Sequence, residues 1–225
     1  MIFVDLNFPV MEQNPFNSVK INRQMSGKSK LDYNYKKLSD EELILIFQKE
    51  DVDAFNEIVY RYKDRIVNFL FRYTGSREES EDLAQDAFLR LYQSKHLYRE
   101  IGRFSTWFYT IVINLAKTNI KVRARHKTIS INNYDEDEEK DYQLPGSMIS
   151  PDDSANSGTE SYYIQKAIDS LNKKFKELII LRDIQDMEYE EIAKIANLPL
   201  GTVKSRINRG RECLKEILEH IYKPE

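Results

Sequence analysis

Residues 197–218 of this 225-residue chain read NLPLGTVKSRINRGRECLKEIL, a helix-breaking segment followed by a long helical pattern. Asn197 suits the left-handed backbone conformation that ends a helix, and Pro199 prevents a preceding helix from continuing. A new helix is expected to begin near Gly201, because apolar positions then recur at helical spacing. The expected buried positions of this helix are Val203, Ile207, Gly210, Leu214 and Ile217.

The segment before this turn, MEYEEIAKIA at 187–196, predicts a short amphipathic helix. Two helices joined by a tight turn are typical of a helix-turn-helix, whose second helix enters the major groove of DNA. That second helix carries four basic residues and no acidic residue from Thr202 to Arg211. Arginine pairs with guanine edges, and lysine, serine and threonine reach phosphates. A solvated basic face on an ordinary helical hairpin is the alternative interpretation. The predicted DNA-contacting residues are Thr202, Lys204, Ser205, Arg206, Asn208 and Arg209.

The composition favours an all-α protein built from small helical domains. Hydrophobic residues make up 41% of the chain and charged residues 32%, with only seven glycines and six prolines. The single cysteine, Cys213, excludes a disulfide within the chain and favours a cytoplasmic setting. No apolar run approaches the roughly 20 residues of a membrane-spanning helix, so membrane insertion is not expected.

Charge and helical periodicity divide the chain into four segments. The net charge of −3 hides a strongly acidic segment at 127–160, which has nine acidic and two basic residues and reads as a flexible linker. Residues 1–38 are polar and aperiodic, so we expect them to be mostly disordered. Two helical domains are expected at 39–126 and 161–225. Within the first, Ser39 and Glu42 predict a capping box, and helices are expected near 39–49, 51–74, 79–95 and 105–124.

The segment SEDLAQDAFLRLYQ at 80–93 predicts a helix with one buried and one partner-binding face. Its buried stripe is Leu83, Ala84, Ala87 and Leu91. Exposed apolar side chains beside carboxylates on the other face indicate a partner surface, with a solvated acidic helix as the alternative. Two carboxylates without a nearby histidine do not predict a metal site, and no cofactor is expected. The predicted partner-binding residues are Asp82, Gln85, Asp86, Leu89 and Tyr92.

The last helix of the first domain and the loop before it form a second basic region. Residues 99–125 contain six basic residues and one acid, an electrostatic pattern suited to phosphates. Asn114 offers a donor and an acceptor to a base edge, although a solvated asparagine is the simpler interpretation. Trp107 and Tyr109 are expected to pack rather than to stack on bases, and Phe108, Ile111, Val112 and Leu115 to face inward. The predicted nucleic-acid residues are Arg99, Arg103, Asn114, Lys117 and Lys121.

Two blocks of this sequence resemble extracytoplasmic-function (ECF) sigma factors. FKELIILRDIQDMEYEEIAKIANLPLGTVKSRINRGRECLKEIL resembles their region 4, and DAFNEIVYRYKDRIVNFLFRYTGSREESEDLAQDAFLRLYQ with FSTWFYTIVINLAKTNIKVRARH resembles region 2. The resemblance covers about 41–126 and 161–221. It implies that 80–93 binds the clamp coiled coil of core RNA polymerase, that the 99–121 residues hold the −10 promoter element, and that the 202–209 residues read the −35 element. An anti-sigma factor is a further implied partner.

Three positions depart from the family pattern. Asn172 stands where proline usually follows leucine, Glu188 stands where serine or threonine usually begins the first helix of the motif, and Gly210 replaces a common alanine. None of these departures removes a DNA-facing basic residue. A plain helix-turn-helix regulator is the competing function, but it has no need of 80–93 or of FSTWFYTIVIN. An enzyme is disfavoured, because the chain contains no Walker A loop, zinc-ligand spacing or Ser/His/Asp pattern.

Overall fold

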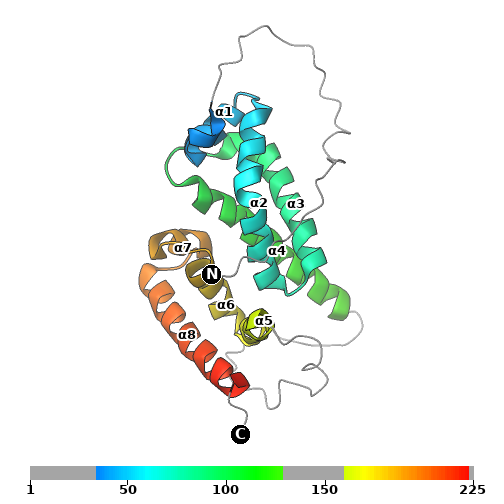
Figure 1. Cartoon of the computed structure of the whole chain (residues 1–225), viewed down its shortest axis with the longest axis vertical. Coiled ribbons are helices and arrows are strands. Elements are labelled where there is room, and N and C mark those ends of the chain that lie inside the picture. The colour runs from blue at the N-terminus through cyan, green and yellow to red at the C-terminus, as the bar shows by residue number, and fades with distance from the viewer. Residues whose placement is uncertain (1–33, 129–159, 223–225) are drawn as a thin grey trace. The chain divides into compact units, whose positions relative to one another are not determined.

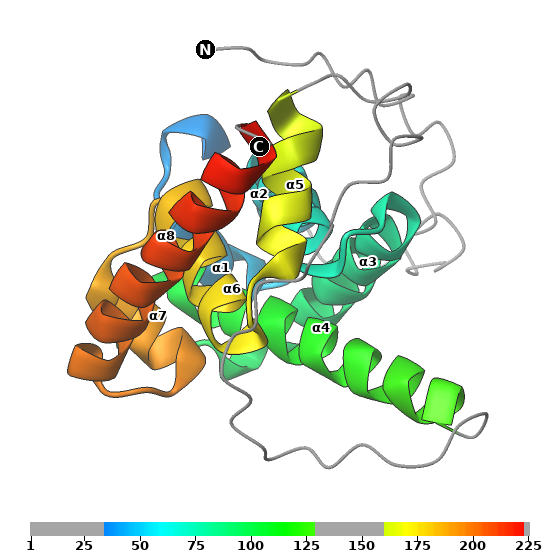
Figure 2. The ribbon, with the colours of Figure 1, turned by 90° about the horizontal axis from the view of Figure 1, so that it is seen from below.

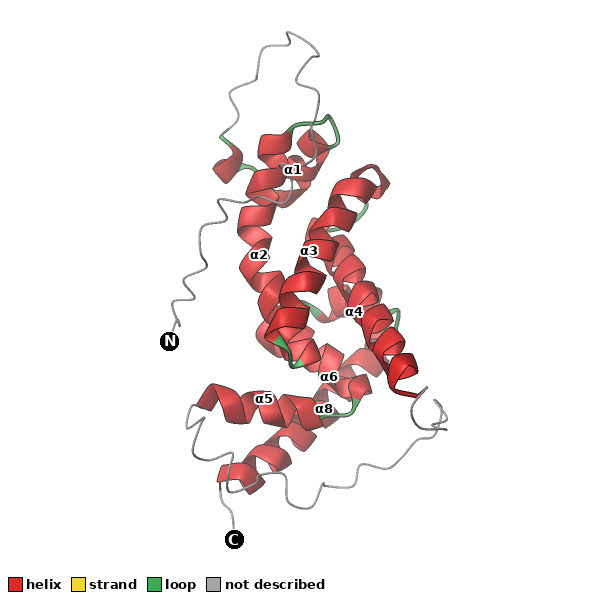
Figure 3. Ribbon diagram, turned by 90° about the vertical axis from the view of Figure 1, so that its right-hand side faces the viewer, coloured by secondary structure: helices red, strands yellow, loops and turns green. Residues whose placement is uncertain are grey.

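A computed structural model describes residues 34–128 and 160–222 of the chain. Predictions that fall on 1–33, 129–159 and 223–225, including most of the linker, lie outside the described residues. All regular elements within the described ranges are helical, which confirms the all-α prediction (Figure 3). Among the described residues, no helix is both long and apolar enough to cross a membrane.

The helices before residue 129 form the first group, in which α3 lies beside α2 and α4 crosses behind both in the view of Figure 1. The capping box at the start of α1 is confirmed. Ser39 N donates to Glu42 Oε2 at 2.7 Å, and Glu42 N donates to Ser39 Oγ at 3.2 Å. The elements of this group are η2 (Tyr35–Lys37), α1 (Asp40–Phe47), α2 (Val52–Thr74), α3 (Arg77–Ser94), η3 (Lys95–Leu97) and α4 (Phe104–Thr128).

The last residues of the segment that we expected to be mostly disordered form an ordered turn before α1. The 3-10 turn η2 precedes α1, and Arg61 on α2 holds it in place. The Arg61 guanidinium donates to the carbonyl of Tyr35 at 2.9 Å, to the carbonyl of Leu38 at 2.8 Å and to Asp40 Oδ1 at 2.8 Å. One guanidinium thus donates to two carbonyls and a carboxylate, which its fork of N–H donors permits.

An aromatic core joins α2 to α4. Tyr62 is buried, and its ring lies 5.4 Å from Phe104 and 5.7 Å from Phe108 between centroids, in edge-to-face geometry. The Tyr62 hydroxyl donates to Asp40 Oδ2 at 2.6 Å, so α1 supplies the hydrogen-bond acceptor that the buried phenol needs.

Gly75 ends α2 with φ 77°, the left-handed conformation that favours glycine. The expected break at TGSRE is thereby confirmed.

The helices after residue 159 form the second group, in which α8 packs against α5, α6 and α7 (Figure 2). Asn172 begins α6, and its side chain accepts a hydrogen bond from Lys174 N at 3.0 Å. An N-cap role therefore accounts for asparagine at this position. The elements are α5 (Glu160–Ser170), α6 (Lys173–Ile179), the π-helical turn η5 (Ile180–Ile184), α7 (Tyr189–Ala196) and α8 (Leu200–Tyr222).

The helix-turn-helix geometry of α7 and α8 matches the prediction. Asn197 ends α7 in the left-handed conformation, with φ 53° and ψ 50°. At the start of α7, Glu188 N donates to Glu191 Oε2 at 3.2 Å, so Glu191 closes the helix end in the absence of serine or threonine. Of the five residues expected to be buried on α8, four are buried and Leu214 is half-buried.

Gly210 lies where α8 passes close to α6. A Cβ atom on Gly210 would lie 3.0 Å from Ile179 Cγ1 and 3.1 Å from Phe175 Cβ. Glycine therefore permits the close approach of the two helices, and this packing offsets its low helix propensity. At Gly201 on the same helix, a Cβ atom would meet nothing within 4 Å.

We expect Gly210→Ala to lower the free energy of unfolding by about 1 kcal/mol. Overpacking costs about 1–3 kcal/mol, and the gain in helix propensity returns about 1 kcal/mol. Gly201→Ala is the matched control and should be neutral or stabilising, because its methyl group enters open space. Urea denaturation of both variants measures the difference. Equal stabilisation by the two substitutions would contradict the packing role of Gly210.

The two helical groups contact each other directly. The described residues from Tyr35 onward group into one compact unit, and α4 packs on α7 while α2 packs on η5 and α5. Arg72 Nη1 on α2 donates to Gln165 Oε1 on α5 at 3.0 Å, and burial lowers the pKa of the Arg72 guanidinium. The sequence predicted two tethered domains and contained no signal for this contact.

Candidate nucleic-acid interface

The predicted DNA-contacting face of α8 points away from the packed side of the helix. Lys204, Ser205, Asn208 and Arg209 are exposed, whereas Thr202 and Arg206 are half-buried. None of the six forms an ion pair with another residue of the described ranges. Lys204 Nζ lies 5.8 Å from the centre of the Tyr189 ring on α7. The basic groups are therefore available to a polyanion.

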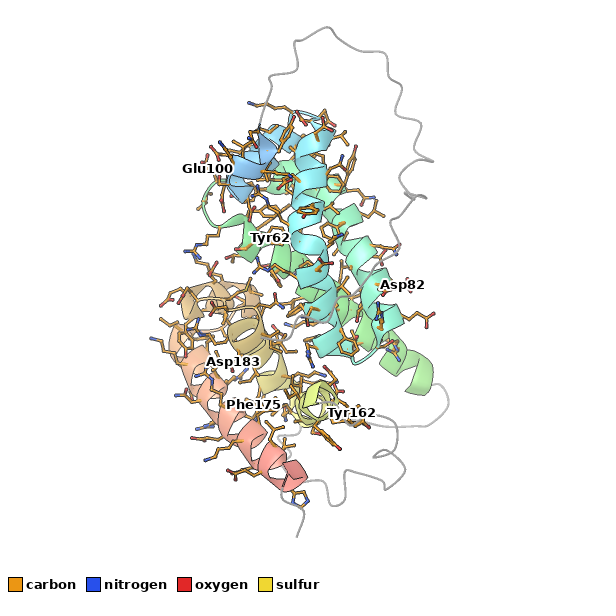
Figure 4. All side chains as sticks on the ribbon, in the orientation of Figure 1. Tyr62, Asp82, Glu100, Tyr162, Phe175 and Asp183 are labelled. Carbon is orange, nitrogen blue, oxygen red and sulfur yellow. The ribbon has the colours of Figure 1, made fainter. Side chains whose placement is uncertain are left out.

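Arg211, the fourth basic residue of this stretch, has a structural partner. Its Nε lies 3.1 Å from Asp183 Oδ2, and its Nη2 lies 2.5 Å from Asp183 Oδ1. These hydrogen bonds raise the pKa of the Arg211 guanidinium. Figure 4 labels Asp183 on η5 beside α8. The bidentate pair fixes α8 to η5 and separates Arg211 from the DNA-facing set.

The predicted partner-binding face of α3 is largely exposed. Asp82, Gln85 and Asp86 are exposed, Leu89 is 43% exposed, and Figure 4 shows Asp82 projecting from the helix. The expected buried stripe of α3 is confirmed, and Phe88, which the stripe did not include, is buried beside it. This face thus combines carboxylates with an apolar side chain, the composition of a protein-binding surface.

Tyr92 is less exposed than the sequence predicted. It is half-buried, and its ring centroid lies 5.2 Å from that of Phe47 and 5.3 Å from that of Phe55. The ring also faces Lys95, whose Nζ lies 4.7 Å from its centre and 2.9 Å from Glu50 Oε2. Aromatic packing at the end of α3 draws the side chain inward. Lys95 itself is only 4% exposed, and helical periodicity did not predict that this lysine is buried.

The loop between η3 and α4 is held by α1 at both ends. Gln48, at the end of α1, donates from Nε2 to the carbonyls of Lys95 at 2.7 Å and Tyr98 at 3.1 Å. At the far end, Phe104 N donates to Glu41 Oε1 at 2.9 Å. The Tyr98 hydroxyl also closes the loop by donating to the carbonyl of Gly102 at 2.9 Å. Helical spacing does not indicate the Gln48 and Glu41 anchors, because they join residues 47 to 63 positions apart in the chain.

The side chains of this loop point outward. Arg99 and Arg103 are exposed, as predicted, and Leu97 and Ile101 are 70% and 89% exposed. The loop therefore presents basic and apolar groups together on an anchored backbone. Such a combination suits a nucleotide strand, which offers both phosphates and base faces.

The predicted nucleic-acid face of α4 is only partly open. Asn114 and Lys121 are exposed. Lys117 is half-buried, and its Nζ lies 2.9 Å from Glu177 Oε2 on α6. In the loop, Arg103 Nη1 lies 3.3 Å from Glu191 Oε2 on α7. The structure therefore places two of the five predicted basic-region residues against acidic groups of the second helical group.

The inner side of α4 is wider than the predicted stripe. Phe108, Val112 and Leu115 are buried as expected, whereas Ile111 is half-buried. Tyr109 is also fully buried, and its hydroxyl donates to Gln185 Oε1 at 2.6 Å. Burial raises the pKa of Tyr109 to about 12. The prediction that Tyr109 packs is confirmed, but its partner across the two helical groups was not predictable from helical spacing.

Two known protein families match this chain, one in each helical group. The family model described as sigma-70 region 2 matches residues 58–126, and the model described as sigma-70, region 4, matches residues 161–214. The chain is 35% identical over 175 residues to the ECF RNA polymerase sigma factor SigW of Bacillus subtilis, across 77% of this chain and 94% of SigW. It is 32% identical over 180 residues to the ECF RNA polymerase sigma-E factor of Escherichia coli K12, across 79% and 93% of the two chains.

Solved structures match the fold as well. The sigma factor RpoE from Bartonella quintana, solved with the anti-sigma factor NepR, gives a TM-score of 0.59 at 23% identity, across 73% of this chain and 96% of RpoE. CnrH, solved with the cytosolic domain of CnrY, gives a TM-score of 0.58 at 18% identity, across 80% and 97% of the two chains. Both likenesses concern the fold of the helical groups.

Proposed function

Because the chain belongs to the ECF sigma factors, we infer that it binds core RNA polymerase and directs the start of transcription at promoters. It is a transcription initiation factor rather than an enzyme. The single observation that carries this function is the presence of both sigma blocks in one chain, in the order region 2 then region 4. A plain helix-turn-helix regulator accounts for the second block and leaves the first without a role.

The proposed reader of the upstream (−35) element is α8. Its exposed or half-buried polar face carries Arg206 and Arg209, which reach base edges, and Lys204, which reaches a phosphate. Support comes from the absence of ion-pair partners for these side chains within the described residues. Arg211 is excluded from the reading set by its bond to Asp183.

The proposed polymerase dock is the outer face of α3. Asp86 and Leu89 lie at its centre, with Asp82 and Gln85 beside them, and all four are exposed. A carboxylate next to an apolar side chain suits a coiled-coil partner, which presents both basic and apolar positions. The proposed partner is the clamp coiled coil of the largest polymerase subunit, which the family resemblance implies. Tyr92 contributes only through the part of its side chain that remains at the surface.

The proposed site for the downstream (−10) element is the anchored loop together with α4. Capturing an open strand requires unstacking a base, which costs a few kcal/mol and must be offset by contacts to the base and its phosphates. Arg99 and Arg103 supply charge in the loop, and Lys117 and Lys121 supply it along α4. Asn114 lies exposed between these groups and offers a donor and an acceptor to a base edge.

We expect Asn114→Ala to reduce promoter opening without weakening polymerase or upstream-element binding. Loss of a base-edge contact should reduce opening by roughly tenfold, in line with about 1–3 kcal/mol for such a contact. Permanganate reactivity of thymines in the holoenzyme–promoter complex measures opening directly. Thr118→Ala, also exposed and one turn along α4, is the matched control. Normal opening with unchanged base preference would remove Asn114 from the site.

Two further assignments rest on family membership. We expect an anti-sigma factor to bind this chain. We also propose that the chain acts in the cytoplasm, where core polymerase and the chromosome lie. Co-purification with a tagged copy of the chain tests the first expectation.

A further inference from the structure

The loop proposed for the downstream strand lies between two buried aromatic residues. Tyr98 is 3% exposed and Phe104 is fully buried. Between them, Arg99, Glu100 and Ile101 are exposed, and Figure 4 labels Glu100. An exposed segment buries little apolar surface, so hydrogen bonds from outside the loop have to hold its backbone in one shape. Those bonds come from α1, which lies beside the loop in Figure 1.

Gln48, at the end of α1, supplies the hydrogen bonds at the start of the loop. Its Nε2 donates to the carbonyl of Lys95 at 2.7 Å and to the carbonyl of Tyr98 at 3.1 Å. The two hydrogens of one amide nitrogen can serve two acceptors at once. One half-buried side chain therefore fixes the path of the backbone from η3 into the loop.

The same end of α1 also holds the side chain of Lys95. Lys95 Nζ lies 4.6 Å from the centre of the Phe47 ring and 2.9 Å from Glu50 Oε2. Glu50 has a φ of 69°, a left-handed conformation that is uncommon for residues other than glycine. Such backbone strain persists where the surrounding structure enforces it, and it is frequent at functional sites. The end of α1 thus holds Lys95 by both its carbonyl and its ammonium group.

Glu41, near the start of α1, supplies the acceptor at the far end of the loop. Phe104 N donates to Glu41 Oε1 at 2.9 Å, and Phe104 is the first residue of α4. The first N–H groups of a helix have no partner within the helix, and a carboxylate suits the positive end of the helix dipole. Both ends of the loop are therefore attached to one short helix.

We propose that α1 positions the strand-binding loop, with Gln48 and Glu41 as the positioning residues. The inference rests on the proposed role of this loop in holding the downstream strand. Gln48 and Glu41 contact backbone groups at the two ends of the loop, so they act on the strand through the shape of the loop. A loop that is already held in its binding shape loses less conformational freedom when the strand binds, which strengthens binding.

Substitutions that remove each hydrogen bond at similar side-chain size test this role in the holoenzyme. Gln48→Met removes the donor, and Gln93→Met, at an exposed position of α3, is the matched control. Glu41→Met removes the acceptor at the other end, whereas Glu41→Gln loses the same charge and keeps an acceptor oxygen. The probe is a single-stranded oligonucleotide that carries the non-template downstream element of a promoter mapped by transcription with this protein. We expect Gln48→Met and Glu41→Met to bind it about 5- to 10-fold more weakly, as for the loss of a hydrogen bond, and the two control variants to bind it normally.

A spin label in the loop reports the order of the loop separately from strand binding. Glu100→Cys in a Cys213→Ser background places the label on an exposed residue, and the chain is labelled before it is assembled with core polymerase. Without DNA, the label should move faster in the Gln48→Met and Glu41→Met variants than in Gln93→Met and Glu41→Gln. Binding to core polymerase and to the upstream element should be unchanged in all four variants.

Arg99→Ala separates this inference from the proposed strand site, because Arg99 supplies charge to the strand directly. Weaker strand binding by Arg99→Ala, with normal strand binding by Gln48→Met and Glu41→Met, would overturn the positioning role and leave the strand site in place. Weaker strand binding by the Gln48 and Glu41 variants at unchanged label mobility would also overturn the positioning role. If none of the three variants weakens strand binding, both the strand site and the positioning role are wrong.

Discussion

Arg206→Ala and Arg209→Ala on α8 should each weaken binding to the upstream promoter element by about 1–3 kcal/mol. Each substitution should also relax the sequence preference at the base pair that the arginine contacts. Both side chains lie on the outer face of the helix and have no ion-pair partner among the described residues. Truncation therefore removes DNA contacts without breaking an intramolecular bond. Fluorescence anisotropy with duplexes that carry single-base changes in the upstream element measures both effects.

Two other basic residues of α8 serve as references for this result. Lys204→Ala should weaken binding more uniformly across sequences and reduce the salt dependence, as expected for a phosphate contact. Lys215→Ala, an exposed position farther along the helix, should leave binding unchanged. If the two arginine variants and Lys204→Ala all bind the upstream element normally, α8 is not the reader.

Substitutions on the outer face of α3 should give the second large effect. We expect Asp86→Lys and Leu89→Ala each to weaken core polymerase binding by about 2 kcal/mol or more, because a few central residues carry most of the energy of an interface. Both side chains are exposed, so the fold should be retained, as thermal unfolding will show. Competition against a labelled wild-type chain for core polymerase measures the change in affinity.

Matched substitutions elsewhere in the first helical group control for charge and apolar area. Asp64→Lys on α2 makes the same charge reversal at an exposed position, and Leu97→Ala removes an exposed leucine from η3. Both should bind core polymerase normally. Equal losses in the control and test variants would contradict a dock centred on α3.

The sequence predicted the features that depend on local spacing. Asn197 ends α7 in the left-handed conformation, and Ser39 and Glu42 form their capping box, because these features involve residues within four positions of each other. The outer face of α8 followed from the same logic, since a 3.6-residue period fixes which side chains share a side. Helix starts and ends agreed to within a few residues for the same reason.

Features that join distant segments were not predictable from one sequence. Gln48 anchors the loop before α4 across about 50 residues, and Tyr109 bonds Gln185 across the two helical groups. Helical spacing cannot reveal such pairs, because it describes one helix at a time. Lys117 illustrates the consequence, since its position on α4 indicated a phosphate contact while its partner in the structure is Glu177. The pairing of Lys117 with Glu177 can be seen only once the packing of α4 on the second helical group is known.

Transcription in vitro with purified core polymerase, this protein and genomic DNA fragments tests the central claim most directly. The protein should convert a core enzyme that initiates nonspecifically into one that starts at discrete positions, and the mapped starts should share an upstream and a downstream element at fixed spacing. Discrete initiation should disappear with Asp86→Lys and persist with Asp64→Lys. Sequence-specific DNA binding by the protein alone, with no defined transcript in the presence of core polymerase, would contradict the sigma-factor function.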